Sequence, residues 1–391
     1  MYFTTPAHKK SLILDNSPEE LSYRGKVSDQ WLLASVLMLM IFGTLAVYSS
    51  IAYFAESHGN TAFNLVFGHI IKLGIAVVVM VIFSKIKYQW IAAVSKYAVI
   101  LSWIFLIIVT LYGNEVFGAR RHLNVAGFSF QPSSFATLAL LVHLSVLLSN
   151  KTTYITSFSK SFLPLMFWVG ITCFLIGLED FSSAAVLLSL SMLLMFIGRV
   201  SMLHLGGLLV IGIVGGMFLL SQSAERESRI TNYVEQVIHI KSDGFALTSG
   251  YQAQQAHIAI AKGGLFGVGI GKSTQRDFLP APYNDFIYAI IAEEYGLIGA
   301  GFVLLAFLMI LLRGIVFIAY SAPDQLGMLM AVACTLTIVT FGLVNAAVAC
   351  GLFPVTGLPM PFVSYGGTSM LFAAMMVGIL LNISRQKKEE K

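Results

Sequence analysis

Long apolar runs alternate with short polar segments along nearly the whole chain of 391 residues. A helix that crosses a lipid bilayer needs about 20 consecutive residues that are mostly apolar. Ten runs come close to that length or exceed it, at residues 31–53, 67–84, 91–112, 132–149, 161–178, 182–198, 202–221, 285–313, 324–349 and 367–384. The pattern predicts an all-α integral membrane protein with ten transmembrane helices.

One connecting segment is much longer than the others. It covers about residues 222–284 and lies between the seventh and eighth predicted helices. We expect a single membrane domain over residues 31–384, preceded by a polar segment at 1–30 and followed by a short tail at 385–391. The first apolar run is too long for the apolar core of a signal peptide, so we expect a retained helix.

The composition agrees with a membrane location. The chain is 57% hydrophobic and 11% charged, whereas soluble domains are about 25% charged, which excludes an ordinary soluble enzyme. The net charge of +5 does not indicate a nucleic-acid partner, because basic residues of membrane proteins gather in cytoplasmic loops. Both termini are predicted to be cytoplasmic, because most Lys and Arg residues fall on the side of the termini: Lys9, Lys10, Arg24, Lys26, Lys85, Lys87, Lys96, Lys151, Lys160, Arg199, Arg313, Arg385, Lys387, Lys388 and Lys391.

Four loops on the opposite, outer face are rich in Gly, Pro and charged residues. They are residues 113–131, the short loop near 179, the long loop 222–284 and residues 351–367. Proline fixes φ, so these loops are expected to be ordered. Irregular backbone within the depth of the membrane is stable only where protein or water supplies hydrogen-bond partners. The sequence therefore predicts a polar cavity that opens on the outer face.

Several common catalytic motifs are absent. The stretch from Gly263 to Ser273 resembles a phosphate-binding loop, but Phe266 stands where that pattern requires glycine. The eight histidines show no metal-ligand spacing, and neither HExxH nor GxSxG occurs. Charged residues on the outer face remain as candidates.

Three carboxylates occur at the start of the eighth predicted helix. Asp285 stands where the polar loop meets the apolar run, so either Asn284 or Asp285 caps the helix, or Asp285 acts as an acid or base. Glu293 and Glu294 lie about 12 Å further along the helix at 1.5 Å per residue. Carboxylates inside a membrane usually face a cavity or a basic partner, and Arg229 or Lys72 would be such a partner.

Basic residues on the outer face offer a second kind of chemistry. Arg120 and Arg121 form a pair that either reaches lipid headgroups or clamps a diphosphate, because a guanidinium group matches phosphate oxygens in a bidentate way. The weakly amphipathic segment from Tyr251 to Ala261 predicts an interfacial helix that lies on the membrane.

Several sequence blocks carry a family resemblance that covers the chain from the first helix to about residue 384. These blocks are Gly118-Ala-Arg-Arg-His-Leu-Asn124 with Phe130-Gln-Pro-Ser133, Tyr251 to Gly271 with Ser273-Thr-Gln275, Leu279 to Glu294, and Pro354-Val-Thr-Gly-Leu-Pro-Met-Pro-Phe-Val-Ser-Tyr-Gly-Gly367. In these blocks the chain resembles the SEDS (shape, elongation, division and sporulation) family. The last block is long enough to make chance agreement negligible.

The resemblance implies a ten-helix peptidoglycan glycosyltransferase that polymerises lipid II into glycan strands at the outer face of the bacterial cytoplasmic membrane. It implies a class B penicillin-binding protein and other divisome membrane proteins as partners. The essential family aspartate corresponds to Asp285, which we assign as the general base. Within the family, the charged N-terminal segment favours a division-type protein at the septum over an elongation-type protein.

We expect the remaining site residues to bind or support the substrates, lipid II and the glycan linked to undecaprenyl diphosphate. The candidates for the diphosphates and sugars are Arg120, Arg121 and Arg229, with Lys72 and Lys262 as weaker ones. The supporting residues are Glu293, Glu294, Asp180, Gln131 and Ser364. No ligand cluster demands a metal or another cofactor, although a divalent cation (Mg²⁺ or Mn²⁺) would share the charge stabilisation.

Some positions depart from the family pattern. The usual Glu and Lys of the block after Gln131 are Ser134 and Thr137, and a usual tryptophan is His122. Asp180 is retained, but the glycine that follows it in the family is lost. The changes at Ser134 and Thr137 remove charged side chains that the family pattern would place near the site, but none of these changes alters the expected type of reaction.

Two other function classes remain open. A ten-helix protein with an outer cavity would also suit a flippase for a lipid-linked precursor, although alternating-access transporters usually contain repeated halves and no repeat is evident. A scaffold that recruits and activates its penicillin-binding partner is the third possibility.

Overall fold

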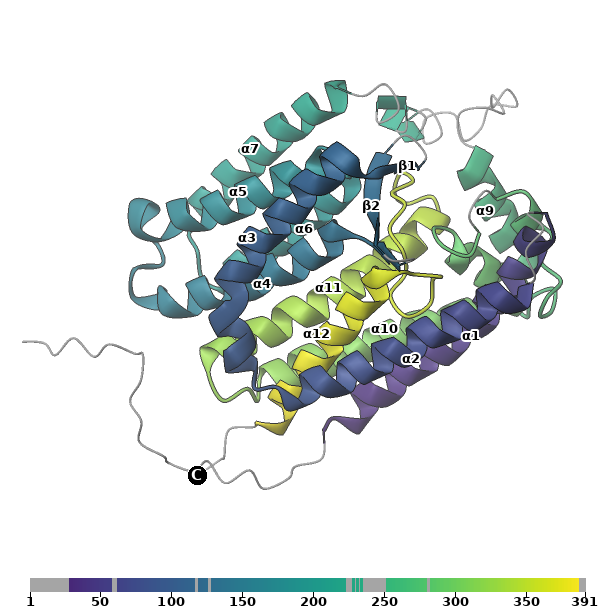
Figure 1. Cartoon of the computed structure of the whole chain (residues 1–391), viewed down its shortest axis with the longest axis horizontal. Helices are drawn as coiled ribbons and strands as arrows, with labels where there is room; N and C mark the ends of the chain where they lie inside the picture. The colour runs from purple at the N-terminus through teal and green to yellow at the C-terminus, as the bar shows by residue number, and fades with distance from the viewer. Residues whose placement is uncertain are drawn as a thin grey trace, which may run out of the picture.

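The computed structural model describes residues 28–57, 62–116, 119–125, 128–222, 227–228, 230–231, 233–234, 251–279 and 282–386. Within these residues the chain is a bundle of long helices (Figure 1). The helices that cross the bundle are α1 (Gln30–Ser57), α2 (Ala62–Lys85), α3 (Tyr88–Tyr112), α4 (Pro132–Asn150), α5 (Leu163–Gly177), α6 (Phe181–Ile197), α7 (Met202–Ser221), α10 (Ile287–Leu312), α11 (Gln325–Ala349) and α12 (Thr368–Arg385).

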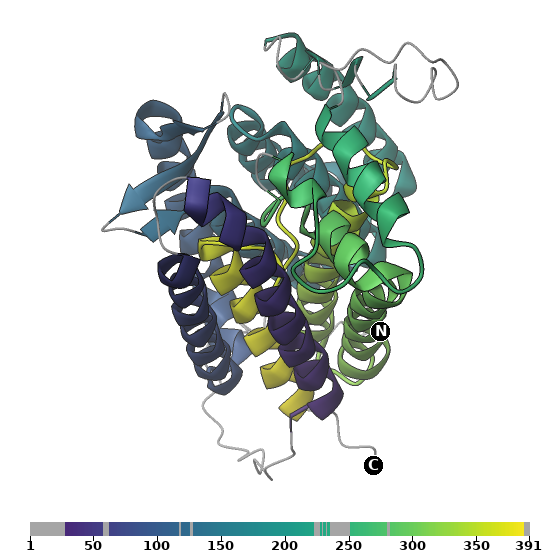
Figure 2. The same ribbon diagram turned by 90° about the vertical axis from the view of Figure 1, so that its right-hand side faces the viewer.

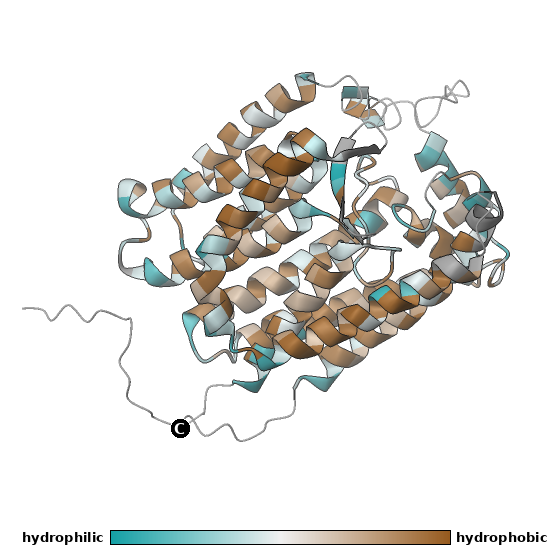
Figure 3. Cartoon of the chain, viewed as in Figure 1, coloured by the Kyte–Doolittle hydropathy of each residue, from teal (hydrophilic) through white to brown (hydrophobic). Residues whose placement is uncertain are grey.

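The predicted spans are confirmed. In the described part of the chain nine helices are long and apolar enough to cross a membrane, and α6 is a shorter apolar helix of 17 residues. The π-helical turn Phe158–Phe162 extends α5, and Arg313–Ala319 extends α10. Apolar residues run along the helices, whereas hydrophilic residues gather toward the two ends of the bundle (Figure 3).

The centre of the bundle is formed by α4, α11 and α12. Within their most apolar windows 72%, 67% and 78% of the residues are buried, compared with 17% in α7. The peripheral helices α2, α3 and α7 leave many large apolar side chains exposed, as expected for surfaces that contact lipid. The central helices therefore provide the rigid frame for the loops at their ends.

The loop 113–131 contains a small antiparallel sheet that the sequence pattern did not predict. Its strands are β1 (Asn114–Val116), β2 (Ala119–Val125) and β3 (Phe128–Phe130), in the order β1-β2-β3. Figure 2 shows the strands and helix α9 (Tyr251–Gly263) at the same end of the bundle. We call this the loop end, and the opposite end, where α1 begins and α12 finishes, the terminal end.

The predicted helix over residues 285–313 is interrupted near its middle. Gly296 has φ 68° and ψ −168°, which breaks the hydrogen-bond pattern of α10. The Gly-rich segment after α9 fills this break: Val268 N–H donates to Glu293 O at 2.9 Å, and Leu297 N–H donates to Gly264 O at 2.9 Å. A Cβ on Gly267 would lie 2.1 Å from Glu294 O, so only glycine permits this approach.

This interlock explains the stretch that resembles a phosphate-binding loop. Its glycines allow two backbones to meet, and the free N–H and C=O groups of the broken helix pair with loop groups. Helix α9 itself packs against α10. The expectation of a helix at residues 251–261 is confirmed, and the helix is anchored to the protein by the segment that follows it.

The terminal end is closed by polar contacts. Arg313 Nε donates to Asp29 Oδ1 and Oδ2 at 3.0 and 2.9 Å, which joins the start of α1 to the extension of α10. Asp324 caps α11 and accepts a hydrogen bond from Tyr88 OH at 2.9 Å. Asn382 bonds both Tyr88 N–H and Ser84 O. These contacts therefore involve six helices, α1, α2, α3, α10, α11 and α12.

Candidate active site

Asp285 lies at the loop end, directly before α10. The helix begins at Ile287, and its N-cap position is Phe286, with no side-chain cap. The interpretation that Asn284 or Asp285 caps this helix is therefore wrong. Asp285 is held instead by its backbone, because Asn345 Nδ2 on α11 donates to Asp285 O at 3.0 Å and to Leu358 O at 2.8 Å. The Asp285 carboxylate therefore does not cap the start of α10.

Gly357 separates Asp285 from Arg121. A Cβ on this glycine, which has φ +70°, would lie 3.0 Å from Arg121 Nη1 and 3.7 Å from Asp285 Oδ2. The guanidinium and the carboxylate therefore face the same point of the backbone. A side chain at this position would crowd the Arg121 guanidinium, so glycine permits both groups to approach this part of the loop.

Arg121 also forms an ion pair with Asp180. Arg121 Nη2 lies 3.6 Å from Asp180 Oδ1, and the Asp180 side chain is 5% exposed. Asp180 caps α6 by accepting from Ser183 N–H at 3.2 Å and from Ser183 Oγ at 2.6 Å. The guanidinium is thus fixed from the side of α6, and its Nε has no hydrogen-bond partner in the described part of the chain.

His122 follows Arg121 in β2. Burial lowers the pKa of His122 below its ordinary value of 6.5, the Arg121 guanidinium lowers this pKa further, and Asp180 acts in the opposite direction. His122 is therefore neutral at physiological pH, and the positive charge at this position belongs to Arg121.

The Pro-rich loop 351–367 is tied to the residues before Asp285. Ser364 Oγ donates to Asn284 O at 2.7 Å, and Tyr365 N–H donates to Tyr283 O at 2.8 Å. The rings of Tyr283 and Tyr365 meet edge to face with centroids 5.7 Å apart. Burial raises the pKa of Tyr283, and Tyr365 and Asp285 raise it further. The two segments form one unit, in which Ser364 has a positioning contact.

Lys72 contacts Tyr365 as well. Its Nζ donates to Tyr365 OH at 3.3 Å and lies 4.3 Å from the centroid of the same ring. The predicted ion pair of Lys72 with Glu293 or Glu294 is therefore wrong. Lys72 instead approaches the loop that contains Ser364 and Tyr365, next to the segment of Asp285.

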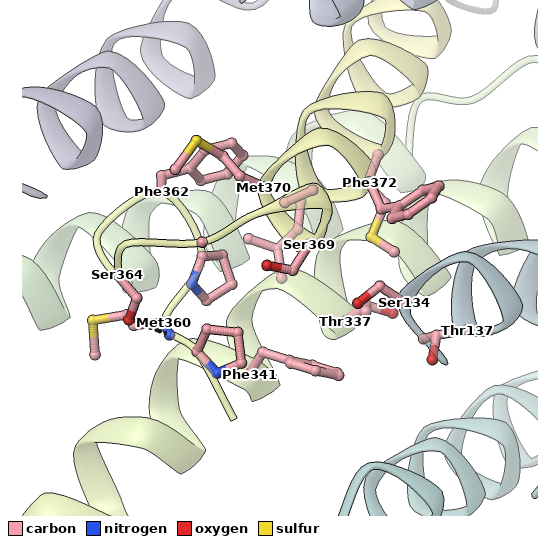
Figure 4. A pocket seen from close by; sticks show the side chains of 16 residues that line it. Ser134, Thr137, Thr337, Phe341, Met360, Phe362, Ser364, Ser369, Met370 and Phe372 are labelled. Carbon is pink, nitrogen blue, oxygen red and sulfur yellow. Dashed lines mark hydrogen bonds between the residues drawn. The ribbon is translucent and has the colours of Figure 1, made fainter. Parts of the chain in front are cut away.

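A cavity lies beside this loop, between α4, α11 and α12. Its wall includes Ser134, Thr137, Thr337, Phe341, Met360 and Ser364. Figure 4 shows Ser134 and Thr137 on one side of it and Met360 and Ser364 on the other. Gln131 contacts this region through Ser134 Oγ, which donates to Gln131 Oε1 at 3.1 Å. The positions of the missing family Glu and Lys thus line the wall with hydroxyl groups.

Glu293 and Glu294 are fully buried away from these groups. Glu293 accepts from Ser273 Oγ and from the backbone N–H groups of Thr274 and Gln275, at 3.1 and 3.2 Å. Glu294 accepts from Ser49 Oγ and from Ser273 N–H at 3.4 Å. These carboxylates therefore hold the segment that follows the Gly-rich stretch against α10 and α1.

Lys262 belongs to this second cluster. Its Nζ donates to Thr274 Oγ1 at 2.6 Å, and Thr274 in turn contacts Glu293. The structure brings Arg121, Asp180, Asp285, Ser364 and Lys72 to one region, whereas Lys262, Glu293 and Glu294 are linked elsewhere through their contacts with Ser273 and Thr274. Arg120 lies in β2, paired in register with Glu115, but its side chain and residue Arg229 lie outside the described residues.

Sequence reasoning missed three residues of this region. Asn345 is a buried polar residue within an apolar run, and such residues are commonly functional in membranes, so this signal was present. Gly357 and Tyr365 lie in the Pro-rich block, but only the fold shows what they contact. Among the described residues no group of three His, Cys, Asp or Glu side chains that would hold a metal ion occurs.

Comparisons with known proteins agree on one family. Residues 29–389 match the family described as "Cell cycle protein", FTSW_RODA_SPOVE. The chain is 35% identical over 365 residues to stage V sporulation protein E of Bacillus subtilis (strain 168), covering 92% of this chain and 98% of that protein. It is 33% identical over 366 residues to a probable peptidoglycan glycosyltransferase FtsW of Trichlorobacter lovleyi, covering 91% of this chain and 93% of that protein.

The fold also matches a solved structure. One chain of a peptidoglycan synthase complex, whose structure concerns the coordination of polymerization and crosslinking, superposes with a TM-score of 0.73. The two sequences are 20% identical, and the match covers 93% of this chain and 99% of the other. The likeness shows that this chain and the chain of that complex have the same multi-helix fold.

Proposed function

Because the chain belongs to the FtsW/RodA/SpoVE (SEDS) family, we propose that it polymerises lipid II at the outer face of the cytoplasmic membrane, with Asp285 as general base. It is a multi-pass membrane protein and a peptidoglycan glycosyltransferase, the activity for which several of its relatives are named. The proposal is supported most directly by the convergence of Arg121 Nη1 and Asp285 Oδ2 on the position that a Cβ of Gly357 would occupy.

The reaction requires one base and one cation. Asp285 takes the proton of the 4-hydroxyl of the acceptor sugar, and the resulting oxygen attacks C1 of the donor sugar. The bond between C1 and the diphosphate oxygen breaks, and the diphosphate leaves with the electron pair. Arg121 stabilises the charge that develops on this group, and Asp180 holds the guanidinium in place. A divalent cation would bind mainly to the diphosphate oxygens.

The terminal end favours an enzyme over a flippase. Translocation by alternating access requires that end to open, whereas Arg313–Asp29, Asp324–Tyr88 and the Asn382 bonds involve six helices there. Polymerisation at the loop end leaves these contacts unchanged. The fold is consistent with a class B penicillin-binding protein as partner, because a chain of the same fold belongs to a peptidoglycan synthase complex.

One reconstitution separates the three function classes. Purified protein receives labelled lipid II in vesicles, with and without a cognate class B penicillin-binding protein. We expect glycan chains whose synthesis is greatest with the partner. Lipid translocation without polymer would establish a flippase. If neither translocation nor polymer is observed, the scaffold function is indicated.

The cellular role is a finer proposal. We favour division at the septum, with both termini in the cytoplasm, because many relatives are named FtsW. The likeness to a stage V sporulation protein makes sporulation the second candidate. A fluorescent fusion would localise to the septum of vegetative cells in the first case and to the developing spore in the second. Localisation along the side wall would indicate elongation and contradict both.

A further inference from the structure

Three polar side chains meet next to the site of Asp285 without a role in the mechanism described so far. They are Lys72, His69 and Tyr365. Lys72 and His69 are three residues apart on α2 and therefore share one face of the helix. The Lys72 ammonium contacts both the hydroxyl and the ring face of Tyr365, and the ring of His69 stacks on Tyr365 with centroids 5.5 Å apart.

The Lys72 ammonium has no carboxylate partner among the residues that the structure describes. By contrast, three arginines in the described part of the chain have carboxylate partners: Arg121 pairs with Asp180, Arg276 with Asp277 and Arg313 with Asp29. A half-buried cation in a predicted membrane span that contacts a phenol, and no carboxylate among the described residues, is costly unless an anion joins it.

His69 gives a second and independent indication. Its side chain is fully buried, and neither ring nitrogen has a hydrogen-bond partner in the described part of the structure. Buried polar atoms are nearly always satisfied in folded proteins. An ammonium, an imidazole N–H and a phenol hydroxyl can all donate hydrogen bonds to the oxygens of one phosphate group.

We propose that Lys72, His69 and Tyr365 bind the diphosphate of the acceptor lipid II, while Arg121 binds the diphosphate of the donor. The inference rests on the proposed polymerase function and divides its two substrates between two cations. The order of contacts from Asp285 through Tyr283 and Tyr365 to Lys72 supports this assignment of cation to substrate.

The chemistry of the reaction requires this division. The donor diphosphate is bonded to the reacting C1 atom, so it must lie beside the base when it leaves. The acceptor diphosphate keeps its bond and is separated from the reacting 4-hydroxyl by a whole disaccharide. Arg121 Nη1 and Asp285 Oδ2 converge at Gly357, whereas Lys72 contacts Tyr365, whose ring packs on Tyr283, two residues before Asp285. The order of the residues therefore matches the order of the reacting groups.

The test uses two modified lipids that each serve in one role. Lipid II with its 4-hydroxyl blocked by galactose acts only as donor. Lipid II with a methylene group in place of the oxygen between C1 and phosphorus acts only as acceptor. The full chain with its class B partner in phosphatidylcholine nanodiscs couples one of each, so KM is measured separately for the two lipids.

We expect Lys72→Met to raise the acceptor KM about tenfold or more, because a hydrogen bond to a charged group contributes about 1.5–3 kcal/mol. The donor KM and kcat should stay within about twofold. His69→Phe keeps the stacked ring but removes both nitrogens, and should raise the acceptor KM by a smaller factor. Lys85→Met is the matched control, because Lys85 lies at the far end of α2 and should alter neither KM.

A rise in the donor KM, an unchanged acceptor KM in Lys72→Met, or an equal effect of Lys85→Met would overturn the proposal. Direct binding of the acceptor-only lipid separates this outcome from failure of the polymerase function. If the unmodified chain makes no product, the polymerase function fails. If Lys72→Met binds the acceptor-only lipid as well as the unmodified chain does, the second diphosphate site fails.

A third arm identifies the source of the phosphate. Phosphatidylglycerol replaces about a third of the phosphatidylcholine in the nanodiscs, which offers the site an ordinary anionic headgroup. We expect the affinity for the acceptor-only lipid to fall less than twofold. Competition strong enough to abolish the difference between the unmodified chain and Lys72→Met would assign the site to phospholipid headgroups.

Discussion

The two ends of the helix bundle hold their charged groups in different ways. At the terminal end, Arg313 makes hydrogen bonds to both carboxylate oxygens of Asp29, and Asp324 satisfies a helix cap and a tyrosine together. At the loop end, Arg121 and Asp285 meet across a glycine, and Lys72 contacts only a phenol among the described residues. Charges at the first end form complete pairs that join helices, whereas at the second end Arg121 Nε has no hydrogen-bond partner and Lys72 has no carboxylate partner among the described residues.

This difference separates structural from functional charge within one membrane protein. A buried ion pair with complete hydrogen bonds joins helices and is costly to break. A guanidinium placed near a carboxylate, with spare donors, suits a substrate with phosphate oxygens and an acidic proton. The same residue types therefore give opposite expectations for stability and for activity at the two ends.

The largest predicted effect at the loop end follows from the change Arg121→Met. Removing a cation that stabilises developing charge costs about 10²–10³ in rate, so kcat for lipid II polymerisation should fall by about that factor. Arg121→Lys keeps the charge but loses the bidentate fork and should recover part of the rate. Equal rates for both variants and the unmodified chain would remove Arg121 from the site.

The matching change at the terminal end is Arg313→Met. It leaves the Asp29 carboxylate, whose side chain is 4% exposed, without its partner, which costs about 3 kcal/mol when one member of a buried pair is removed. We expect a lower thermal unfolding temperature in detergent and an unchanged kcat per folded molecule. A loss of kcat with normal stability would contradict the contrast between the ends.

Gly357→Ala tests the space between Arg121 and Asp285. The residue has φ +70°, which costs about 1–2 kcal/mol for a side chain in that region, and the new Cβ would lie 3.0 Å from Arg121 Nη1. We expect kcat to fall about tenfold while the protein still folds. An unchanged kcat, measured by glycan formation, would show that the approach of the two groups at Gly357 is not needed.

The smallest predicted effect concerns pH. The pKa of His122 is lowered in the folded protein, so below pH 6.5 the unfolded chain binds more protons than the folded one, and stability falls as the pH falls. Above pH 6.5 this contribution is complete. His122→Gln should flatten the fall of the unfolding temperature between pH 7 and pH 5. An identical slope in both proteins would contradict this assignment.

The helices could be predicted from sequence because lipid imposes a length and an apolar composition on every span. The break at Gly296 was missed, because α10 stays apolar on both sides of it and the Gly-rich segment that fills it is distant in sequence. The strands of the loop 113–131 were missed as well, since a short sheet in a polar loop has no apolar run to mark it.

Asp285 and Arg121 could be proposed from sequence because charge is rare in this chain and family blocks surround both residues. Their common contact with Gly357 could not, since it depends on how a loop after α11 returns to the residues before α10. Glu293 and Glu294 show the opposite error: buried carboxylates suggested a site, but hydroxyl and backbone groups of Ser273, Thr274 and Gln275 satisfy Glu293.

The same substitution at the two ends gives the most direct test of the account. Asp285→Asn and Asp29→Asn each remove one carboxylate charge with little change in shape, and both proteins are assayed for lipid II polymerisation and thermal unfolding. We predict that Asp285→Asn lowers the rate at least about 100-fold, as for a lost general base, with unchanged unfolding temperature, whereas Asp29→Asn lowers stability by about 2 kcal/mol with unchanged rate per folded molecule. Polymerisation by Asp285→Asn at the unmodified rate would contradict the assignment of the base.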